Sequence, residues 1–226
     1  QDNLSHFICT ERVLYGLPEF EHKASDLSNA KNPIGEMNEH HVDLRRSRSG
    51  AEVFAEYQEI AKMRMEQLRS ADDAYFETAA MTPTGPGTVA DFLHIRILDI
   101  WTHEQDMRRA LHLPGHGSGP AAEHTIDRLI RTIPIVVGKR AGTPEGGCVV
   151  IEVTGDVQRT IATTITDGRG QVTDVAPPHA LCTITMDSDA FLQLATGRAT
   201  HAEINYSIVG DNELGTKVVS QFNMMI

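Results

Sequence analysis

The stretch that decides the fold of this 226-residue chain reads Phe92-Leu-His-Ile-Arg-Ile-Leu-Asp-Ile-Trp-Thr-His103. It lies within residues 88–113, which follow a Thr-Pro-Thr-Gly-Pro-Gly breaker and end at Pro114-Gly115, so they predict one long helix. Seven of the ten residues from Phe92 to Trp101 are apolar. A helix that is apolar on nearly every face is buried on most sides. We therefore expect it to form the centre of a helical domain.

Two polar residues inside this apolar helix, Asp99 and His103, are four positions apart. Their side chains stand one turn apart on one face, where a carboxylate oxygen and an imidazole nitrogen can bind the same metal ion. By spacing alone, an ordinary surface contact between them is the commoner arrangement. The apolar surroundings favour the metal, because a buried ionised carboxylate needs a strong partner. Asp106, one turn further on, could orient the histidine ring.

The third ligand has to come from another helix, and His6 is the best candidate because it lies in a helix predicted over residues 2–17. The alternative for His6 is an ordinary half-buried histidine. His40 and His41 are competitors, but their polar surroundings are more typical of a solvated loop. Cys9, three residues after His6, could supply a thiolate or could simply be a small buried residue.

The rest of the N-terminal part also predicts helices. Residues 19–47 are polar and predict a long connection with at most short structure, of the kind that often forms a lid or a binding loop. Ser49-Gly50-Ala51-Glu52 has the form of a capping box and opens a helix that runs to about residue 69. A further helix is expected over 121–139, with a kink at Pro134.

The pattern changes at residues 141–147, Ala-Gly-Thr-Pro-Glu-Gly-Gly, which we interpret as the boundary between domains 1–142 and 147–226. Beyond it, β-branched runs between turn signals predict strands at 148–154, 160–165 and 181–186. Helices are expected at 188–196 and 211–222, the second after an Asp suited to cap it. The predicted fold class is α+β, with a helical N-terminal domain and a small α+β C-terminal domain.

Composition and charge restrict the partners. The 31 Asp and Glu residues against 20 Lys and Arg give a formal net charge of −11, which argues against nucleic acid because phosphate binding needs clustered basic residues. No apolar run approaches the ~18 residues of a membrane span. Three widely spaced cysteines make no disulfide framework, and nothing resembles a signal peptide, so we expect a reducing cytoplasm. The chain starts at Gln1 within a helical pattern, so we expect the first helix to be partial.

Several motifs occur together: Asp2-x3-His6, Gly85-Pro-Gly-Thr-Val-Ala-Asp91-Phe, Asp99-Ile-Trp101-Thr-His103-Glu-Gln-Asp106, Thr185-Met-Asp187-x3-Phe191 and Val209-Gly-Asp211. In combination they resemble the mycothiol-dependent maleylpyruvate isomerase family, over essentially the whole chain. The resemblance implies a DinB-like four-helix bundle followed by a sterol-carrier-like domain. It also implies a divalent metal, usually zinc, held by His6, Asp99 and His103.

The resemblance further implies an enzyme that activates the thiol of the cofactor mycothiol for addition to an electrophilic small-molecule substrate. Addition to a cis double bond, rotation and elimination would give the trans isomer, as in maleylpyruvate isomerisation. Two alternatives stay open, namely a mycothiol S-transferase and a non-catalytic, metal-stabilised small-molecule binding protein. The family's acidic ligand is best matched by Glu. The shorter Asp99 brings the metal closer to the helix backbone and leaves the substrate chemistry open.

An anionic substrate needs a cationic partner, and arginines are the candidates. We predict Arg198, which follows a helix of the C-terminal domain, as a catalytic residue. Arg96 and Arg45 are predicted as cofactor-binding residues, and Arg46 is a further candidate. Arg96 lies three residues before Asp99 on a similar face of the helix. For each arginine, the alternative is an ordinary solvated side chain.

Overall fold

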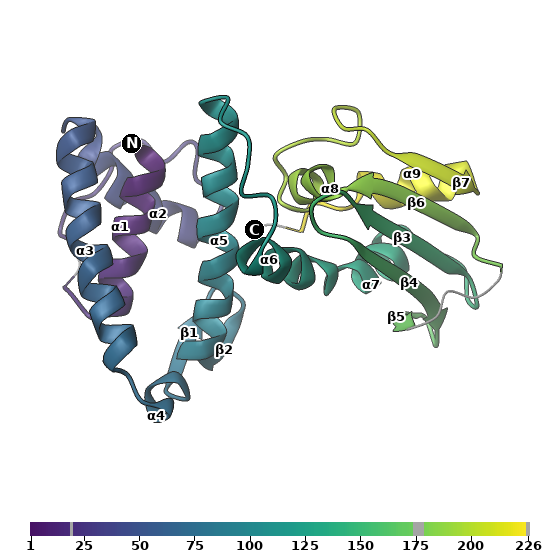
Figure 1. Cartoon of the computed structure of the whole chain (residues 1–226), viewed down its shortest axis with the longest axis horizontal. Coiled ribbons are helices and arrows are strands. Elements are labelled where there is room, and N and C mark those ends of the chain that lie inside the picture. Colours follow the sequence, from purple (N-terminus) through teal and green to yellow (C-terminus); the bar gives the residue numbers. More distant parts are fainter. Residues whose placement is uncertain (19, 174–178, 225–226) are drawn as a thin grey trace. The chain divides into compact units, whose positions relative to one another are not determined.

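The computed structural model describes residues 1–18, 20–173 and 179–224. The chain forms two compact units, Gln1–Arg96 and Ile97–Ile226. Figure 1 shows one long helix, α5 (Val89–Ala110), that begins in the first unit and continues without a break into the second. The predicted class, α+β with helices first and a sheet in the C-terminal part, is confirmed.

Along the chain, the first unit ends at Arg96 and the second begins at Ile97, both within α5. This division comes earlier than the boundary predicted at residues 141–147. The physical reason lies in the second half of α5, where Leu98 and Trp101 are buried in the apolar core of the second unit. That core also takes in α6 (Pro120–Ile130). The boundary at 141–147 stays a prediction about where independently folding domains separate.

The first unit is built from α1 (Asp2–Tyr15), α2 (Pro33–Arg46), α3 (Gly50–Ser70), the short α4 (Asp73–Phe76) and the first part of α5. Ile8, Val53 and Ile60 form its apolar centre, where α1 packs against α3. The helices predicted at 2–17 and 49–69 are confirmed. So is the capping box, in which Ser49 and Glu52 each bond the other's backbone N–H.

The prediction for residues 19–47 is wrong, because residues 33–46 form the helix α2. Asn32 caps it by accepting a hydrogen bond from the Gly35 N–H at 2.9 Å, and Pro33 occupies the first turn. The buried face of α2 consists of Glu39, His41, Val42 and Arg45. An apolar stripe was therefore not available to indicate this helix, since three of the four buried residues are polar.

A small hairpin precedes α5 at the stretch predicted only as a breaker. Strand β1 (Ala79–Thr82) pairs antiparallel with β2 (Gly85–Thr88), and the chain turns between them. Asp91 Oδ2 then accepts a hydrogen bond from the Thr88 N–H at 2.9 Å, and Thr88 Oγ1 accepts one from the Asp91 N–H at 3.2 Å. This reciprocal pair satisfies backbone donors at the start of α5 and fixes where the helix begins.

The second unit contains a five-stranded sheet in the order β5-β4-β3-β6-β7. The strands are β3 (Cys148–Thr154), β4 (Arg159–Thr166), β5 (Arg169–Thr173), β6 (Cys182–Asp187) and β7 (Ser207–Gly210). Only the β3–β6 pair is parallel. One face of the sheet packs against α6, α8 (Ser188–Ala195) and α9 (Asn212–Ser220), which confirms the strands and helices predicted there.

Three features of the second unit differ from the prediction. The edge strands β5 and β7 were not predicted, because both are short and largely exposed and carry little apolar alternation. The helix expected over 121–139 is interrupted after Ile130 and continues as α7 (Ile133–Ile135) and the π-helical turn η1 (Val136–Arg140). Pro134 lies just after the interruption and has no N–H for a helical hydrogen bond.

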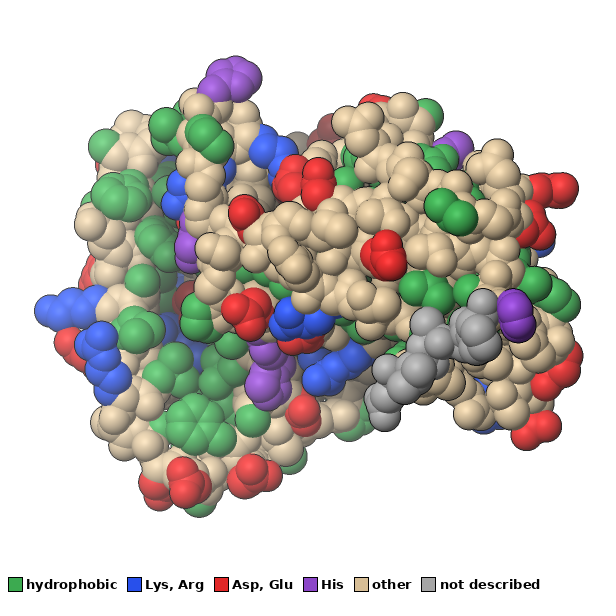
Figure 2. Space-filling model, turned by 45° about the vertical axis from the view of Figure 1, so that its right-hand side comes forward, with side chains coloured by type: hydrophobic (Ala, Val, Ile, Leu, Met, Phe, Trp, Pro, Cys, Tyr) green, Lys and Arg blue, Asp and Glu red, His purple; other side chains and the backbone are tan. Residues whose placement is uncertain are grey.

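None of the described helices is long and apolar enough to cross a membrane. On the face shown in Figure 2, Lys and Arg side chains stand in small groups beside Asp and Glu side chains. Such pairing is explicit in the second unit, where Arg159 Nε donates to Asp127 Oδ1 at 2.7 Å. Pairs of this kind are exposed, so each contributes little to stability.

Candidate metal centre

Asp99 and His103 lie one turn apart on α5, and their side chains converge. His103 Nε2 is 3.5 Å from Asp99 Oδ1, and each side chain is 23% exposed. In a tetrahedral zinc site with ligand distances near 2 Å, neighbouring ligand atoms are about 3.3 Å apart. The observed spacing therefore suits two ligands of one metal ion, and the partial exposure leaves room for a further, non-protein ligand.

The other nitrogen of the His103 ring faces Asp106, as the sequence predicted. His103 Nδ1 lies 3.2 Å from Asp106 Oδ2. A carboxylate beside Nδ1 favours the tautomer with its hydrogen on that nitrogen, and this tautomer would leave the lone pair of Nε2, the atom nearer to Asp99, for a ligand. The ring is thus oriented for metal binding by a neighbour on its own helix.

Asp106 is kept ionised by its surroundings. Burial raises the pKa of the Asp106 carboxyl, but hydrogen bonds from His103 and Arg198 outweigh this effect and hold the pKa well below its ordinary value. Arg198 donates to Asp106 Oδ2 from Nη2 at 2.9 Å and from Nε at 3.2 Å. Arg109 Nη1 donates to Asp106 Oδ1 at 3.1 Å. The carboxylate that orients His103 is therefore clamped by two guanidinium groups.

His6 lies on α1, and its Nδ1 is buried. Among the described residues, His6, Asp99 and His103 form a group that could hold a metal ion, with one ligand atom from each within 4.8 Å of the others. The chemistry of this donor set, two imidazoles and one carboxylate, is that of a catalytic zinc site with an open position. Cys9 is completely buried and does not belong to the group. The assignment of the three residues of this group as metal ligands stays a prediction.

Arg96 and Arg45, the two predicted cofactor-binding residues, are both buried in the first unit and paired with carboxylates. Arg96 Nη2 donates to Glu11 Oε1 at 2.8 Å, and Arg64 Nε binds the other oxygen of Glu11 at 3.0 Å. Arg45 donates to both oxygens of Glu56 from Nη2 and Nε, at 2.6 and 3.0 Å. Their assignment to cofactor binding stays a prediction, and the contacts they make in the structure are those of internal ion pairs.

The remaining arginine candidates are also paired. Arg46 contacts Glu39 and Asp43 on its own helix, and Arg198 binds Asp106 as described. Sequence reasoning missed Arg109, although its place three residues after Asp106 was a usable signal. It also missed Glu11, for which no signal was available, because the partners of Glu11 lie 53 and 85 residues away in the chain.

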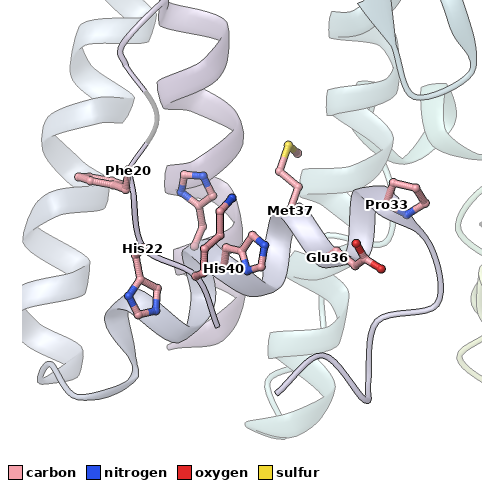
Figure 3. Close-up of a pocket in the computed structure, with 8 residues that line it drawn as sticks. Phe20, His22, Pro33, Glu36, Met37 and His40 are labelled. Carbon is pink, nitrogen blue, oxygen red and sulfur yellow. The ribbon is translucent and has the colours of Figure 1, made fainter. Parts of the chain in front are cut away.

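The competing histidines line a separate cavity of about 200 Å³ between residues 20–23 and α2 (Figure 3). His40 Nδ1 accepts a hydrogen bond from the Ala24 N–H at 3.1 Å, and His22 Nε2 lies 2.8 Å from Asp43 Oδ2. His41 is buried with its ring edge-on to Phe20. Each histidine has a local structural partner, and none belongs to the metal-binding group.

The chain thus combines a helical N-terminal part, a candidate metal site and an α+β C-terminal part. Residues 1–108 match the family model described as the mycothiol maleylpyruvate isomerase N-terminal domain, and residues 138–223 match the SCP-2 sterol transfer family. The N-terminal part of the chain is therefore similar to that of the mycothiol-dependent maleylpyruvate isomerases, and the C-terminal part is similar to the sterol transfer family.

Solved structures give weaker likenesses. Two crystal structures of the mycothiol-dependent maleylpyruvate isomerase, one of them a histidine-to-alanine mutant, align with a TM-score of 0.47 and 12% identity, over 91% of this chain and 74% of theirs. A UbiJ-SCP2 ubiquinone synthesis protein aligns with a TM-score of 0.33 and 16% identity, over 46% of this chain and 91% of its own. No curated protein is similar enough in sequence to count as a match.

Proposed function

We propose that this chain is a mycothiol-dependent enzyme that uses a divalent metal, zinc in the simplest case, to activate the cofactor thiol for addition to an electrophilic double bond. The reaction class is cis–trans isomerisation of the maleylpyruvate type. The observation that carries the proposal is the orientation of His103, whose Nδ1 faces Asp106 while its Nε2 faces Asp99. The match of residues 1–108 to the mycothiol maleylpyruvate isomerase N-terminal domain supports the thiol cofactor and the reaction class.

Contacts within the first unit support His6 as the third ligand. Arg96 binds Glu11 of α1 and also lies over the Phe7 ring, with its guanidinium carbon 5.7 Å from the ring centre. The contacts with Arg96 fix α1 against this level of α5, and His6 is the neighbour of Phe7 in the chain. Asp99 follows Arg96 by three residues, and so lies about one turn further along the same helix. The contacts of Arg96 with Glu11 and Phe7 therefore favour a His6 side chain that is directed toward Asp99.

A metal ion bound by these residues would lower the pKa of a thiol that coordinates it, so that the thiolate is available at neutral pH. His6 and His103 bind as neutral ligands and Asp99 contributes one negative charge, so the three together leave a dication with net positive charge. Asp106 supports this arrangement by holding the proton of His103 on Nδ1. Arg198 and Arg109 in turn keep Asp106 ionised and in place.

The protein's own cysteines do not offer a competing nucleophile. Cys9, Cys148 and Cys182 are all buried and unpaired with one another. Burial, with the nearby charge of Asp211, raises the pKa of the Cys182 thiol to about 11, so it stays protonated at neutral pH. The burial of the cysteines supports a small molecule as the source of the reactive thiol.

The proposal is tested by metal content and by turnover together. Wild type is expected to bind one zinc per chain, and His103→Ala is expected to lose it. His201→Ala, the same change in a histidine outside the site, serves as the matched control and should retain the metal. Equal metal content in His103→Ala and wild type would refute the assignment of His103 as a metal ligand.

Turnover is then measured with mycothiol, maleylpyruvate and a panel of electrophiles. Isomerisation without net consumption of thiol is the expected result. Stoichiometric loss of thiol to an electrophile would instead identify an S-transferase, the alternative that Asp99 in place of Glu keeps open. Absence of turnover with every substrate would leave a binding protein and would refute the enzymatic proposal.

A further inference from the structure

A second cavity, of about 520 Å³, lies within the second unit, at the C-terminal end of α5. A volume of this size suits a small organic ligand. The last turns of α5 form one wall, and residues 112–117, which follow the helix, form another. Asp156, which comes after β3, and Asp189, on α8, complete the lining. The candidate metal ligands do not line this cavity, and the proposed chemistry does not use it.

Two of the charged residues in the lining are already paired with each other. Arg109 Nη2 donates to Asp189 Oδ1 at 2.9 Å, and Arg109 Nη1 donates to Asp106 Oδ1 at 3.1 Å. The other oxygen of Asp189 accepts a hydrogen bond from Gln193 Nε2 at 2.8 Å. This pair therefore stabilises the wall of the cavity and has little hydrogen-bonding capacity left for a ligand.

Among the described residues of the lining, Arg108 and Asp156 are the charged groups that remain for an occupant. Arg108 Nε donates to Glu104 Oε1 at 2.8 Å, while the two terminal nitrogens of Arg108 bond no described residue. The carboxylate of Asp156 likewise has no hydrogen-bond or ion-pair partner in the part of the chain that the structure describes. One unused cation and one unused anion in the same cavity match a ligand that carries a charge of each sign.

An α-amino acid is a small molecule with this pattern of charge. Its carboxylate can accept two parallel hydrogen bonds from the terminal nitrogens of a guanidinium group, and its ammonium group can donate to a carboxylate. Leu113, which is 56% exposed, and Pro114 add an apolar surface to the lining, and this surface favours an apolar side chain on the ligand. A dicarboxylate would be repelled by Asp156, and a dication by Arg108.

The backbone at His112 is an independent indication of a binding site. The His112 N–H donates to the Arg109 carbonyl at 3.2 Å, and the Leu113 N–H donates to the Arg108 carbonyl at 2.9 Å. This pair of bonds ends a helix at a left-handed residue, and His112 has a φ of 54°. Glycine is the usual residue there, because a side chain strains this conformation. Such strain is concentrated at ligand sites, and the side chain of His112 lines the cavity.

Further contacts hold residues 112–117 in place. The backbone carbonyl of His116 accepts hydrogen bonds from Trp101 Nε1 at 3.1 Å and from Gln105 Nε2 at 3.3 Å. The ring of His116 also contacts Glu104, at 2.9 Å. The wall is therefore formed before a ligand arrives, which lowers the entropic cost of binding.

We propose that this cavity binds a free α-amino acid with a large apolar side chain. Arg108 binds the carboxylate of the ligand, with the ring of His112 as a second hydrogen-bonding partner. Asp156 binds the ammonium group, and Leu113 and Pro114 contact the side chain. The inference does not rest on the proposed function, because neither a metal nor a thiol takes part in it.

Calorimetric titration of the full chain tests the requirement for both charges. L-Leucine and L-phenylalanine are expected to bind. L-Leucinamide lacks the carboxylate and N-acetyl-L-leucine lacks the ammonium group, so each is expected to bind at least about tenfold more weakly than L-leucine. Absence of binding of either amino acid at millimolar concentration, or blocked analogues that bind as tightly as L-leucine, would overturn the inference.

Substitutions test the two charged residues. Asp156→Asn and Arg108→Gln are each expected to weaken the binding of L-leucine at least about tenfold, because each removes a charged hydrogen-bonding partner. Asp127→Asn and Arg169→Gln, the same changes at exposed positions outside the cavity, should bind like wild type. Equal affinity in all of these proteins would contradict the assignment.

His112→Gly separates a binding role from a structural one. Glycine is favoured at this position, so the variant should unfold at the same temperature as wild type or at a higher one. Its affinity for L-leucine should nonetheless fall several-fold, because the ring is lost. A variant that binds as tightly as wild type would refute the role of the ring. A variant that unfolds at a lower temperature would contradict the strain from which that role is argued.

Discussion

Two carboxylates that lie between two arginines, Glu11 in the first unit and Asp106 in the second, form clusters that differ in burial. In the first unit, Glu11 lies between Arg64 and Arg96, and the three side chains are 13%, 2% and 5% exposed. In the second unit, Asp106 lies between Arg198 and Arg109, and the three are 24%, 25% and 31% exposed. The second cluster also contacts a candidate metal ligand, His103.

The difference in burial separates a structural role from a positioning role. The charges around Glu11 are out of water, so each depends on the others, and the cluster fixes α1, α3 and α5 in one register. The charges around Asp106 still reach solvent, so losing one of them is tolerable for folding. What depends on Asp106 is the orientation of one imidazole ring.

The largest expected effect is on stability, at Glu11. The substitution Glu11→Gln removes the charge that two buried arginines share, and an uncompensated buried charge typically costs ~3–5 kcal/mol. We expect the free energy of unfolding, measured with urea, to fall by about that amount. Glu66→Gln, at an exposed position of α3, is the control and should change it by less than about 0.5 kcal/mol. A loss of the same small size at Glu11 would remove the distinction between the two clusters.

A smaller change in the free energy of unfolding, which depends on pH, is expected on substitution of Glu56. Burial raises the pKa of its carboxyl, but hydrogen bonds from Arg45 and Arg48 dominate and lower the pKa below its ordinary value. A carboxyl with a lowered folded-state pKa stabilises the protein above its unfolded pKa of about 4.3, and this contribution is lost as the pH falls through the folded value.

Glu56→Gln should therefore lower the free energy of unfolding by about 2 kcal/mol at pH 7, since charged hydrogen bonds to a fully buried arginine are lost. The gap between wild type and variant should close below about pH 4. Urea unfolding from pH 7 to pH 3 measures it, with Glu59→Gln at an exposed position as the control. A gap that stays constant with pH would show that the charge of Glu56 does not matter.

The same contrast explains what the sequence could predict. The long helix α5 and the face that Asp99 and His103 share could be predicted from the sequence. The burial expected on most sides of the helix is only partly confirmed, because Leu98 and Trp101 are buried but Ile97 is 39% exposed. The helix α2 was not readable, because its buried positions are filled by Glu39, His41 and Arg45. Apolar periodicity reports only apolar burial.

Arginine partners were the least predictable part of the site. Arg198 was predicted to bind an anion, and its catalytic role stays a prediction, but its nearest anion is Asp106, 92 residues away in the chain. Arg45 and Arg96 likewise find carboxylates on other helices. An arginine that binds substrate and one that binds an internal carboxylate have the same sequence, so only the tertiary contacts separate them.

At Asp106 we expect the smallest change in the free energy of unfolding and a specific change in metal affinity. Asp106→Asn keeps the size of the side chain and removes the charge that holds the proton of His103 on Nδ1. Loss of such an outer carboxylate typically weakens metal binding 10–100-fold. We expect that decrease in zinc affinity, measured by competition with a chromophoric chelator, while unfolding by urea changes by no more than about 1 kcal/mol.

Asp127→Asn provides the matched control, and it should leave zinc affinity unchanged because Asp127 pairs with Arg159 at an exposed position. The zinc affinity of Arg198→Gln should lie between those of Asp106→Asn and Asp127→Asn, because Arg109 still binds one oxygen of Asp106 in that variant. If Asp106→Asn were instead to unfold the protein as strongly as Glu11→Gln, the half-exposed cluster would be a structural element like the buried one. In that case the orientation of His103 would be a consequence of folding rather than the purpose of the cluster.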